Sequence, residues 1–249
     1  MGQKSEIKKI IAVTSGKGGV GKSFVTSLLS VNLSRQGYKV GILDADITGP
    51  SIPKIFGINK QRAIMIGDKM QPVETEKGIK IMSLNLLLEE ENQPVIWRGP
   101  LVGSTAKQLY EDTNWGELDY LVIDMPPGTS DVTLTVMQTL PIDNTIIVTS
   151  PQDLVGLIVQ KSIIMTEKMG VPILGLVENM SYALCPDCGK AIQIFGESKA
   201  ESVAQDMNIK LIDKLPLDSY MTGLCDTGKI EHYEEAREKF AQFGRGFDL

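Results

Sequence analysis

The stretch Gly16-Lys17-Gly18-Gly19-Val20-Gly21-Lys22-Ser23 decides the fold of this chain. It matches the pattern G-x-x-x-x-G-K-[ST] and lies between a β-branched run at residues 10–14 and apolar residues at helical spacing over residues 24–33. A glycine-rich turn between a strand and a helix points successive backbone N–H groups at phosphate oxygens, and the helix N terminus adds its positive dipole. Lys22 is expected to neutralise the β- and γ-phosphates of a nucleotide and Ser23 to ligate its Mg²⁺.

Short β-branched runs alternate with helical patterns along the chain, which is typical of a mostly parallel sheet with helices on both faces. Residues 59–94 interrupt this alternation, and a hairpin or an irregular excursion is expected there. No linker or repeat divides the chain, so residues 1–249 are expected to form a single α/β domain. The expected strands are residues 10–14, 40–43, 120–123, 145–149, 173–177 and 210–215, and the expected helices are residues 24–33, 102–111, 132–138, 154–169, 197–207 and 233–243.

The composition limits the possible partners. With 25 Lys and Arg against 31 Asp and Glu, the net charge is -6, which provides no basic field for non-specific nucleic-acid binding. No apolar run reaches the roughly 18 to 20 residues of a membrane-spanning helix, and no signal-peptide core is visible. We therefore expect a cytoplasmic protein that binds neither nucleic acid nor a membrane.

Acidic residues follow two of the expected strands at their carboxyl ends. Asp44-Ala45-Asp46 comes after residues 40–43, and Asp124 ends the apolar run 120–123 ahead of Met125-Pro126-Pro127-Gly128. Open α/β sheets bind ligands at this edge, so these carboxylates are expected beside the phosphate loop, with Asp124 in contact with the Mg²⁺ shell. A capping or turn role is the alternative for Asp44 and Asp46.

Two of the three cysteines form the close pair Cys185-Pro186-Asp187-Cys188. Two thiolates at this spacing can bind one metal centre, but a closed tetrahedral site usually takes four ligands. Beyond the pair the chain offers Cys225, interpreted as a buried or bystander thiol, and the lone His232. A C2 dimer with this loop at its interface would supply four thiolates, which suits a 4Fe-4S cluster or a zinc ion. The alternative that Cys185 and Cys188 are a pair of structural thiols remains open.

Lys17 is a second lysine at the start of the phosphate loop. With it, the loop resembles the deviant Walker A class, which includes the MinD and ParA ATPases, the nitrogenase iron protein and the Mrp/ApbC cluster carriers. In that class this lysine crosses a dimer interface to the partner's nucleotide. The resemblance therefore implies an ATP-dependent homodimer, whereas a solvated loop charge is the alternative for Lys17.

The match becomes more specific over nearly the whole chain. The two acidic motifs, Trp97-Arg98-Gly99-Pro100 and Asn179-Met180-Ser181-Tyr182 ahead of Cys185 and Cys188 resemble the Mrp/ApbC family of iron-sulfur cluster carriers. The resemblance implies Mg-ATP as cofactor and a 4Fe-4S cluster that is bridged by this cysteine pair from two subunits and passed to apo-proteins.

The same resemblance implies roles for individual residues in a slow ATPase. Asp46 would position the attacking water, Asp44 would hold a water on the Mg²⁺, and Lys17 and Lys22 would assist catalysis. Asn179 would recognise the adenine, and Pro216 would pack against it.

Two other interpretations keep the fold but change the function. A MinD- or ParA-like positioning ATPase would bind a membrane or DNA, with zinc or nothing at the cysteine pair. The mixed charges of residues 231–249 do not favour this, because a membrane-binding tip needs bulky apolar residues opposite a basic face. A zinc-bridged scaffold would use nucleotide only as a structural ligand, and its function would tolerate loss of Lys17 or Asp46.

Overall fold

The computed structural model of the chain describes residues 5–47, 49–88, 99–151 and 155–245. The strands of its central sheet are β1 (Glu6–Ser15), β2 (Val40–Asp44), β5 (Val73–Glu74), β6 (Lys80–Ser83), β7 (Glu117–Asp124), β8 (Asn144–Thr149), β9 (Ile173–Glu178) and β12 (Leu211–Lys214). Two hairpins lie outside this sheet, formed by β3 (Ile64–Ile66) with β4 (Lys69–Gln71) and by β10 (Ala183–Leu184) with β11 (Ala191–Ile192). The helices are α1 (Lys22–Arg35), α2 (Ile52–Ile55), α3 (Gly99–Glu111), α4 (Asp131–Thr139), α5 (Val155–Lys168), α6 (Ala200–Asp206), α7 (Ser219–Asp226) and α8 (Glu238–Ala241), with 3-10 turns η1 (Leu84–Leu86) and η2 (Ile230–His232).

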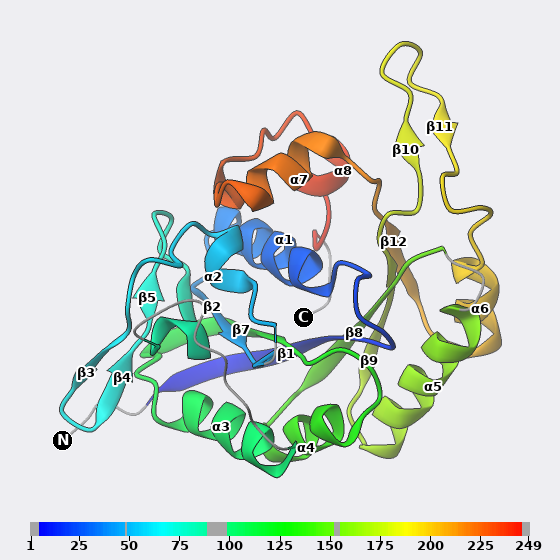
Figure 1. Cartoon of the computed structure of the whole chain (residues 1–249). Coiled ribbons are helices and arrows are strands. Elements are labelled where there is room, and N and C mark those ends of the chain that lie inside the picture. The colour runs from blue at the N-terminus through cyan, green and yellow to red at the C-terminus, as the bar shows by residue number, and fades with distance from the viewer. Residues whose placement is uncertain (1–4, 48, 89–98, 152–154, 246–249) are drawn as a thin grey trace.

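The central sheet has the strand order β12-β9-β8-β1-β7-β2-β6-β5. Its neighbours pair in parallel except at one edge, where β5 pairs antiparallel with β6. Helices cover both faces, with α1, α7 and α8 on one side and α3 and α4 on the other (Figure 1). This confirms the mostly parallel α/β sheet that the alternation of strand and helix patterns predicts.

Two apolar layers hold the sheet between its helices. Ile11 and Val13 of β1 pack on the face that α1 covers, whereas Ile10 and Ala12 pack on the opposite face. This separation follows from the alternation of side chains along a strand. Because β1 lies between β7 and β8 and is covered on both faces, its residues 10–15 are all buried. A fully buried strand of this kind gives the phosphate loop that follows it a rigid base.

Residues 59–94 contain the expected hairpin, which is β3 with β4, and the edge strands β5 and β6. The six strands expected from the sequence are confirmed, and so are the first five expected helices. Helix α7 was not expected. None of the helices in the described ranges is long and apolar enough to cross a membrane.

The expectation of one helix over residues 233–243 is wrong. Tyr233 is extended, with φ -61° and ψ 145°, and α8 has only four residues. The guanidinium of Arg35 donates hydrogen bonds to the backbone carbonyls of Glu231 and Tyr233, at 3.1 and 2.7 Å. Those carbonyls are therefore taken by a side chain of α1 instead of by a helical N–H group, so a tertiary contact overrides the local pattern.

Candidate functional site

The phosphate loop leaves β1 and ends at the first residue of α1, as the sequence predicts. Gly21 has φ +83°, and a Cβ there would lie 2.1 Å from the Asn179 side-chain nitrogen, so glycine is needed for both conformation and space. Among the described residues, no side chain caps α1 and no acidic residue occupies its first turn. The helix N terminus therefore keeps its N–H donors and positive dipole for an anion.

The side chains of Lys22 and Ser23 both contact that of Asp124 at the phosphate loop. The Lys22 ammonium lies 2.6 Å from Oδ1 of Asp124, and the Ser23 hydroxyl donates to Oδ2 of the same carboxylate at 2.6 Å. A third donor, the Thr26 hydroxyl one turn along α1, lies 3.1 Å from Oδ1. Asp124 is fully buried, so these donors stabilise its charge where water cannot. The two helix residues of the motif and the strand-ending aspartate thus form one site.

Asp44 and Asp46 lie on the neighbouring strand end. Asp44 pairs with Asp124 in the register of β2 with β7, so the two carboxylates lie side by side at the carboxyl edge. The Asp46 carboxylate lies 3.9 Å from the Lys22 ammonium. Burial, and secondly the nearby charge of Asp124, raise the pKa of Asp44 well above its usual range, although Lys22 acts in the opposite direction. A divalent cation at this edge would relieve the crowding of the carboxylates.

The donor set suits Mg²⁺. Ser23, Asp44 and Asp124 offer hydroxyl and carboxylate oxygens, which are the hard ligands that this ion prefers. Asp44 is held in place by hydrogen bonds from the Ile52 backbone N–H and the Ser83 hydroxyl, both at 3.3 Å. Such outer contacts orient metal-binding carboxylates. Mg²⁺ bound here would neutralise phosphate charge next to the loop.

Lys17 lies at the half-buried beginning of the loop. Its backbone carbonyl accepts a hydrogen bond from the Ser15 hydroxyl at 2.9 Å, and the Gly128 N–H donates to the Ser15 carbonyl at 2.9 Å. The turn after β7 is thereby held against the phosphate loop. Trp97 and Arg98, the first two residues of the motif Trp97-Arg98-Gly99-Pro100, lie outside the described residues.

A cavity of about 190 Å³ opens beside the phosphate loop. The Asn179 side chain lies at its wall and donates to the Val20 carbonyl of the loop at 3.0 Å. Pro216 also lines it, so the structure brings together the two residues that sequence analysis assigned to the base. The remaining lining residues include Phe24 of α1 and Asp218, Met221, Thr222 and Cys225 around α7.

The cysteine pair lies at the turn of the β10–β11 hairpin, which projects from the body of the molecule (Figure 1). The Cys185 N–H donates to the Lys190 carbonyl and the Gly189 N–H to the Cys185 carbonyl, both at 2.9 Å, which closes a tight turn around the thiols. Hydrogen bonds from the Cys188 and Asp187 backbone, and then from the Cys188 thiol, lower the pKa of Cys185. The hairpin thus favours the thiolate, the form that binds metals.

One chain does not complete a metal site with these thiols. In the part of the chain that the structure describes, no group of three or more His, Cys, Asp and Glu side chains could hold a metal ion. Cys225 instead lines the cavity by the phosphate loop, where burial raises its pKa to about 11. The Cys225 side chain is partly buried, and its place in that cavity had no signal in the sequence.

Thr26 and Ser83 were also missed by sequence analysis. Thr26 lies one helical turn after Lys22 and therefore on the same face of α1. A hydroxyl at that spacing was the signal from which its contact with Asp124 could have been predicted. Ser83 ends β6, whose pairing with β2 lies within the segment that broke the strand and helix alternation. Its contact with Asp44 therefore depends on a long-range pairing that local patterns do not reveal.

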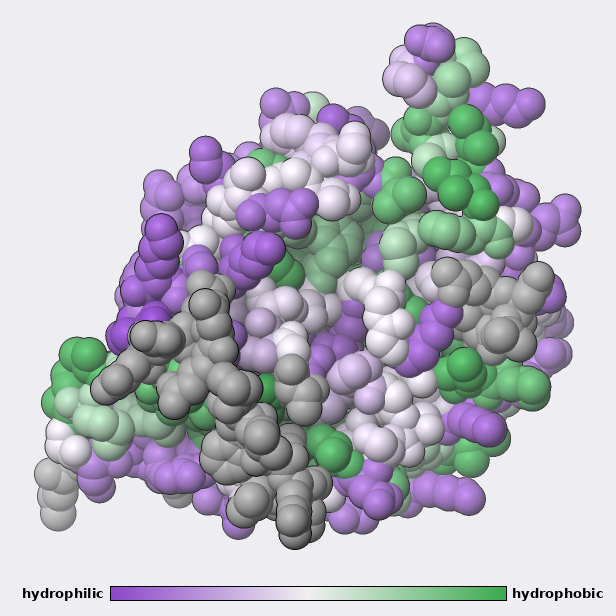
Figure 2. Space-filling model, viewed as in Figure 1, coloured by the Kyte–Doolittle hydropathy of each residue, from purple (hydrophilic) through white to green (hydrophobic). Residues whose placement is uncertain are grey.

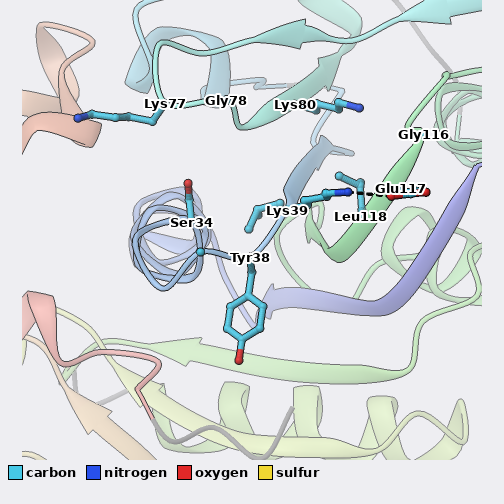
Figure 3. Close-up of a pocket in the computed structure, with 11 residues that line it drawn as sticks. Ser34, Tyr38, Lys39, Lys77, Gly78, Lys80, Gly116, Glu117 and Leu118 are labelled. Carbon is cyan, nitrogen blue, oxygen red and sulfur yellow. Dashed lines mark hydrogen bonds and ion pairs between the residues drawn. The ribbon is translucent and has the colours of Figure 1, made fainter.

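A second cleft, of about 580 Å³, lies at the amino ends of β2 and β7, away from the phosphate loop. Three lysines line it, but Figure 3 shows their side chains pointing in different directions. The Lys39 ammonium pairs with Glu117 at 2.7 Å, and the Lys80 ammonium donates to the Trp115 carbonyl at 2.8 Å. Lys77 points away from both. The lysines do not converge on one anion, so this cleft is no phosphate site.

Known proteins were compared with this chain. The family model of the NUBPL iron-transfer P-loop NTPases, in the ParA group, matches residues 6–245. A protein from Clostridium perfringens named iron-sulfur cluster carrier protein is 52% identical over 234 residues, which cover 91% of this chain and 82% of that protein. One of the same name from Methanocaldococcus jannaschii is 46% identical over 225 residues, or 90% of this chain and 78% of that protein.

Solved structures agree with this relationship. A nucleotide-binding protein from Archaeoglobus fulgidus in complex with ADP has a TM-score of 0.82 and 45% identity, over 92% of this chain and 89% of that chain. MinD from Aquifex aeolicus has a TM-score of 0.67 over 95% of both chains, but at 20% identity it shows the fold alone. The resemblance to cluster carriers that the motifs indicate is thereby confirmed. The chain belongs to the family of NUBPL-type iron-transfer P-loop NTPases.

Proposed function

We propose that this protein carries a 4Fe-4S cluster between two of its subunits, on Cys185 and Cys188 of each, and delivers it to apo-proteins under the control of ATP. Family membership makes the chain an ATPase with Mg-ATP and an iron-sulfur cluster as cofactors. The observation that carries the proposal is the projecting thiol hairpin, which is attached directly beside the phosphate loop. Residues 1–249 act as one domain in the cytoplasm.

The chemistry of the thiols fits a cluster. Cysteine thiolates are the usual ligands of iron-sulfur clusters, and four of them hold a 4Fe-4S cluster. Each chain contributes two on its hairpin, so two copies related by a two-fold axis supply the set. The lowered pKa of Cys185 favours the thiolate, which is the form that ligates iron. The dimer is therefore part of the metal site.

The surface around the thiols also suits a protein contact. Leu184, immediately before Cys185, is 56% exposed. Ile192 at the end of the returning strand and Ile194 just after it are 48% and 52% exposed. Figure 2 shows apolar side chains gathered along the projecting hairpin. Exposed apolar groups that cluster in this way mark interaction surfaces. They would be covered when two hairpins, or a hairpin and a recipient, come together around the cluster.

At the nucleotide, this chain's own residues bind, orient and neutralise. The loop N–H groups and Lys22 hold the phosphates, Ser23, Asp44 and Asp124 hold the Mg²⁺ shell, and Asp46 orients the attacking water. Lys17 reaches the nucleotide of the other subunit. Hydrolysis needs little more than this positioning, because phosphoryl transfer depends mainly on geometry and charge neutralisation.

A short path connects the two sites. β9 ends at Glu178, the next residue is Asn179 at the phosphate loop, and the hairpin strand β10 begins at Ala183. The segment between Asn179 and Ala183 is held against residues 215–217, which continue into the wall of the cavity. The Ser181 N–H donates to the Leu215 carbonyl, and the Leu217 N–H donates to the Tyr182 carbonyl. A change at the nucleotide thus has a direct route to the thiols.

The proposal is tested by anaerobic reconstitution of the purified protein with iron and sulfide. The expected product is a brown protein whose iron and sulfide contents are equal and which activates an apo-protein that needs a 4Fe-4S cluster. A protein that takes up no iron and sulfide, or that keeps its iron when challenged with apo-protein, would contradict the carrier function. A positioning ATPase or a zinc-bridged scaffold is expected to give the first of these results.

The hairpin thiols should differ from Cys225 in their pH profile of alkylation. A lowered pKa means that the Cys185 thiolate forms at lower pH, so the midpoint of its reaction with iodoacetamide should lie well below that of Cys225. Cys225 should need a pH near its pKa of about 11. Cys188→Ala should move the Cys185 midpoint upward, because one donor to its sulfur is lost. Equal midpoints for Cys185 and Cys225, measured by peptide mass spectrometry, would contradict this assignment.

Nucleotide should protect Cys225. If the base occupies the cavity between Asn179 and Pro216, it covers the thiol that lines the same cavity. In a Cys185→Ala, Cys188→Ala background at pH 9, saturating Mg-ATP is expected to slow alkylation of Cys225 at least about tenfold. Inorganic tripolyphosphate should not protect it, because that ligand has no base. Identical rates with and without Mg-ATP would place the base elsewhere.

A further inference from the structure

Two walls from different parts of the chain enclose the cavity beside the phosphate loop. Phe24, the third residue of α1, forms one wall. The other wall comes from the turn at Pro216 to Asp218 and from α7, which begins at Ser219. The space between the walls therefore depends on how α1 and α7 are held relative to each other.

The C-terminal segment, residues 230–243, holds the first wall. The Phe240 ring packs edge-on against the Phe24 ring, with centroids 6.0 Å apart and planes at 85°. The Asn32 amide of α1 donates to the carbonyls of Phe240 and Phe243, both at 2.7 Å, and its oxygen accepts from the Tyr233 hydroxyl. Asn32 and Phe240 are only 3% and 2% exposed. A buried amide with all these partners fixes the segment on α1.

The same segment holds the second wall through Arg237. Its guanidinium donates to Oδ2 of Asp218 at 2.5 Å and lies over the Tyr220 ring, 4.7 Å from the centroid. Oδ1 of Asp218 accepts from the Met221 N–H at 3.0 Å, so this carboxylate also caps α7. Arg237 thus fixes the residue at which the turn along the cavity becomes α7.

The two contacts are one helical turn apart. The Phe240 N–H donates to the Arg237 carbonyl at 2.9 Å, and α7 and α8 lie together over α1 (Figure 1). We infer that the C-terminal segment is a clamp that sets the width of the base cavity, with Arg237 and Phe240 as positioning residues for the nucleobase. Neither residue touches the phosphate loop in the contacts that the structure describes. The inference rests on the proposed function, in which this cavity takes the base of ATP.

Loss of the clamp should affect binding of the nucleobase but not binding of the phosphates. The phosphate end is held by its own contacts, among them the Lys22 and Ser23 contacts with Asp124 and the Asn179 contact with Val20. Releasing Arg237 frees the Asp218 carboxylate and loosens the α7 wall, but leaves those contacts in place. The loss should therefore appear in the affinity for ATP and not in the affinity for a ligand that lacks the base.

The test measures the dissociation constants of ATP and of inorganic tripolyphosphate by calorimetry for the full chain and for Arg237→Gln. ATP is expected to bind roughly tenfold more weakly to the variant, a loss of about 1.4 kcal/mol, while tripolyphosphate binds unchanged. Arg237→Lys should recover part of the ATP affinity, because it keeps the charge but not the planar fork. Phe240→Leu should also weaken the binding of ATP and leave the binding of tripolyphosphate unchanged. This substitution removes the ring contact with Phe24 and keeps an apolar side chain in its place.

Lys239→Gln is the matched control, because Lys239 lies in the same segment and pairs with Asp213 at 2.7 Å, away from the cavity. Lys239→Gln should change neither the dissociation constant of ATP nor that of tripolyphosphate. Equal losses for both ligands in Arg237→Gln, or an unchanged ATP affinity, would overturn the clamp. The wild-type protein separates this failure from that of the proposed base site: if it binds ATP no more tightly than tripolyphosphate, the base site itself is wrong.

Discussion

Replacing Cys185 and Cys188 with alanine is expected to abolish the iron and sulfide content of the reconstituted protein, together with its activation of apo-protein. In the proposed function the pair supplies the thiolates of each subunit. Among the described residues of one chain, no group of three or more His, Cys, Asp and Glu side chains could hold a metal ion in its place. Alanine is the better replacement, because a serine hydroxyl can still ligate iron. Both residues lie on a projecting hairpin and contribute little to the core, so the midpoint of thermal unfolding should hardly change.

Cys225→Ala is the control for this loss. Its thiol lines the cavity by the phosphate loop, so removing it should leave the iron content intact. Iron, sulfide and the visible absorption of each reconstituted variant provide the measurement. If the double variant held as much cluster as the wild type, the assignment of the ligands would be wrong. If Cys225→Ala lost the cluster instead, the third cysteine would have to be a ligand.

Asp46→Asn and Lys17→Ala are each expected to lower ATP turnover at least about 100-fold with little change in stability. Asp46 lies at the carboxyl end of β2, 3.9 Å from the Lys22 ammonium, where a carboxylate can orient water at the terminal phosphate. In the proposed function Lys17 acts on the nucleotide of the other subunit, so its removal would take away charge that is needed during phosphoryl transfer. Phosphate release at saturating Mg-ATP measures both effects.

Exposed loop residues of the same types provide matched controls. Asp68→Asn and Lys60→Ala remove the same charges at positions on the surface, and turnover should stay within about twofold of the wild type. Mixing Lys17→Ala chains with Asp46→Asn chains gives a further check. If Lys17 acts across the interface, some mixed dimers keep one intact site, and part of the turnover returns. Undiminished turnover in either single variant would favour a scaffold in which nucleotide is only a structural ligand.

The sheet and the phosphate site could be predicted because their signals are local. The run at residues 10–14, the loop from Gly16 to Ser23 and the helix that follows are contiguous, and parallel strands bring their carboxyl ends to one edge. Asp44 and Asp124 could therefore be placed together without knowledge of the strand order. Their register in β2 and β7 agrees with that expectation.

The α7 wall of the cavity beside the phosphate loop and the C-terminal segment could not be predicted in the same way. Residues 233–243 carry a helical pattern, but the contacts of Arg35 and Asn32 with their backbone decide the conformation, and these partners are about 200 positions away. The wall formed by α7 depends on the contact of Arg237 with Asp218, which also joins separate parts of the chain. Cys225 therefore had no local signal that it lies beside Asn179, and the contact of Ser83 with Asp44 needed the pairing of β6 with β2.

The account depends on two chains meeting to complete one cluster. The measurement that tests this most directly is native mass spectrometry of the anaerobically reconstituted protein with Mg-ATP. A species with the mass of two chains and about four iron and four sulfide atoms is predicted, and the Cys185→Ala, Cys188→Ala variant should lack the iron and sulfide. A single chain that carried the whole cluster, or a protein that stayed monomeric with both ligands present, would contradict the account.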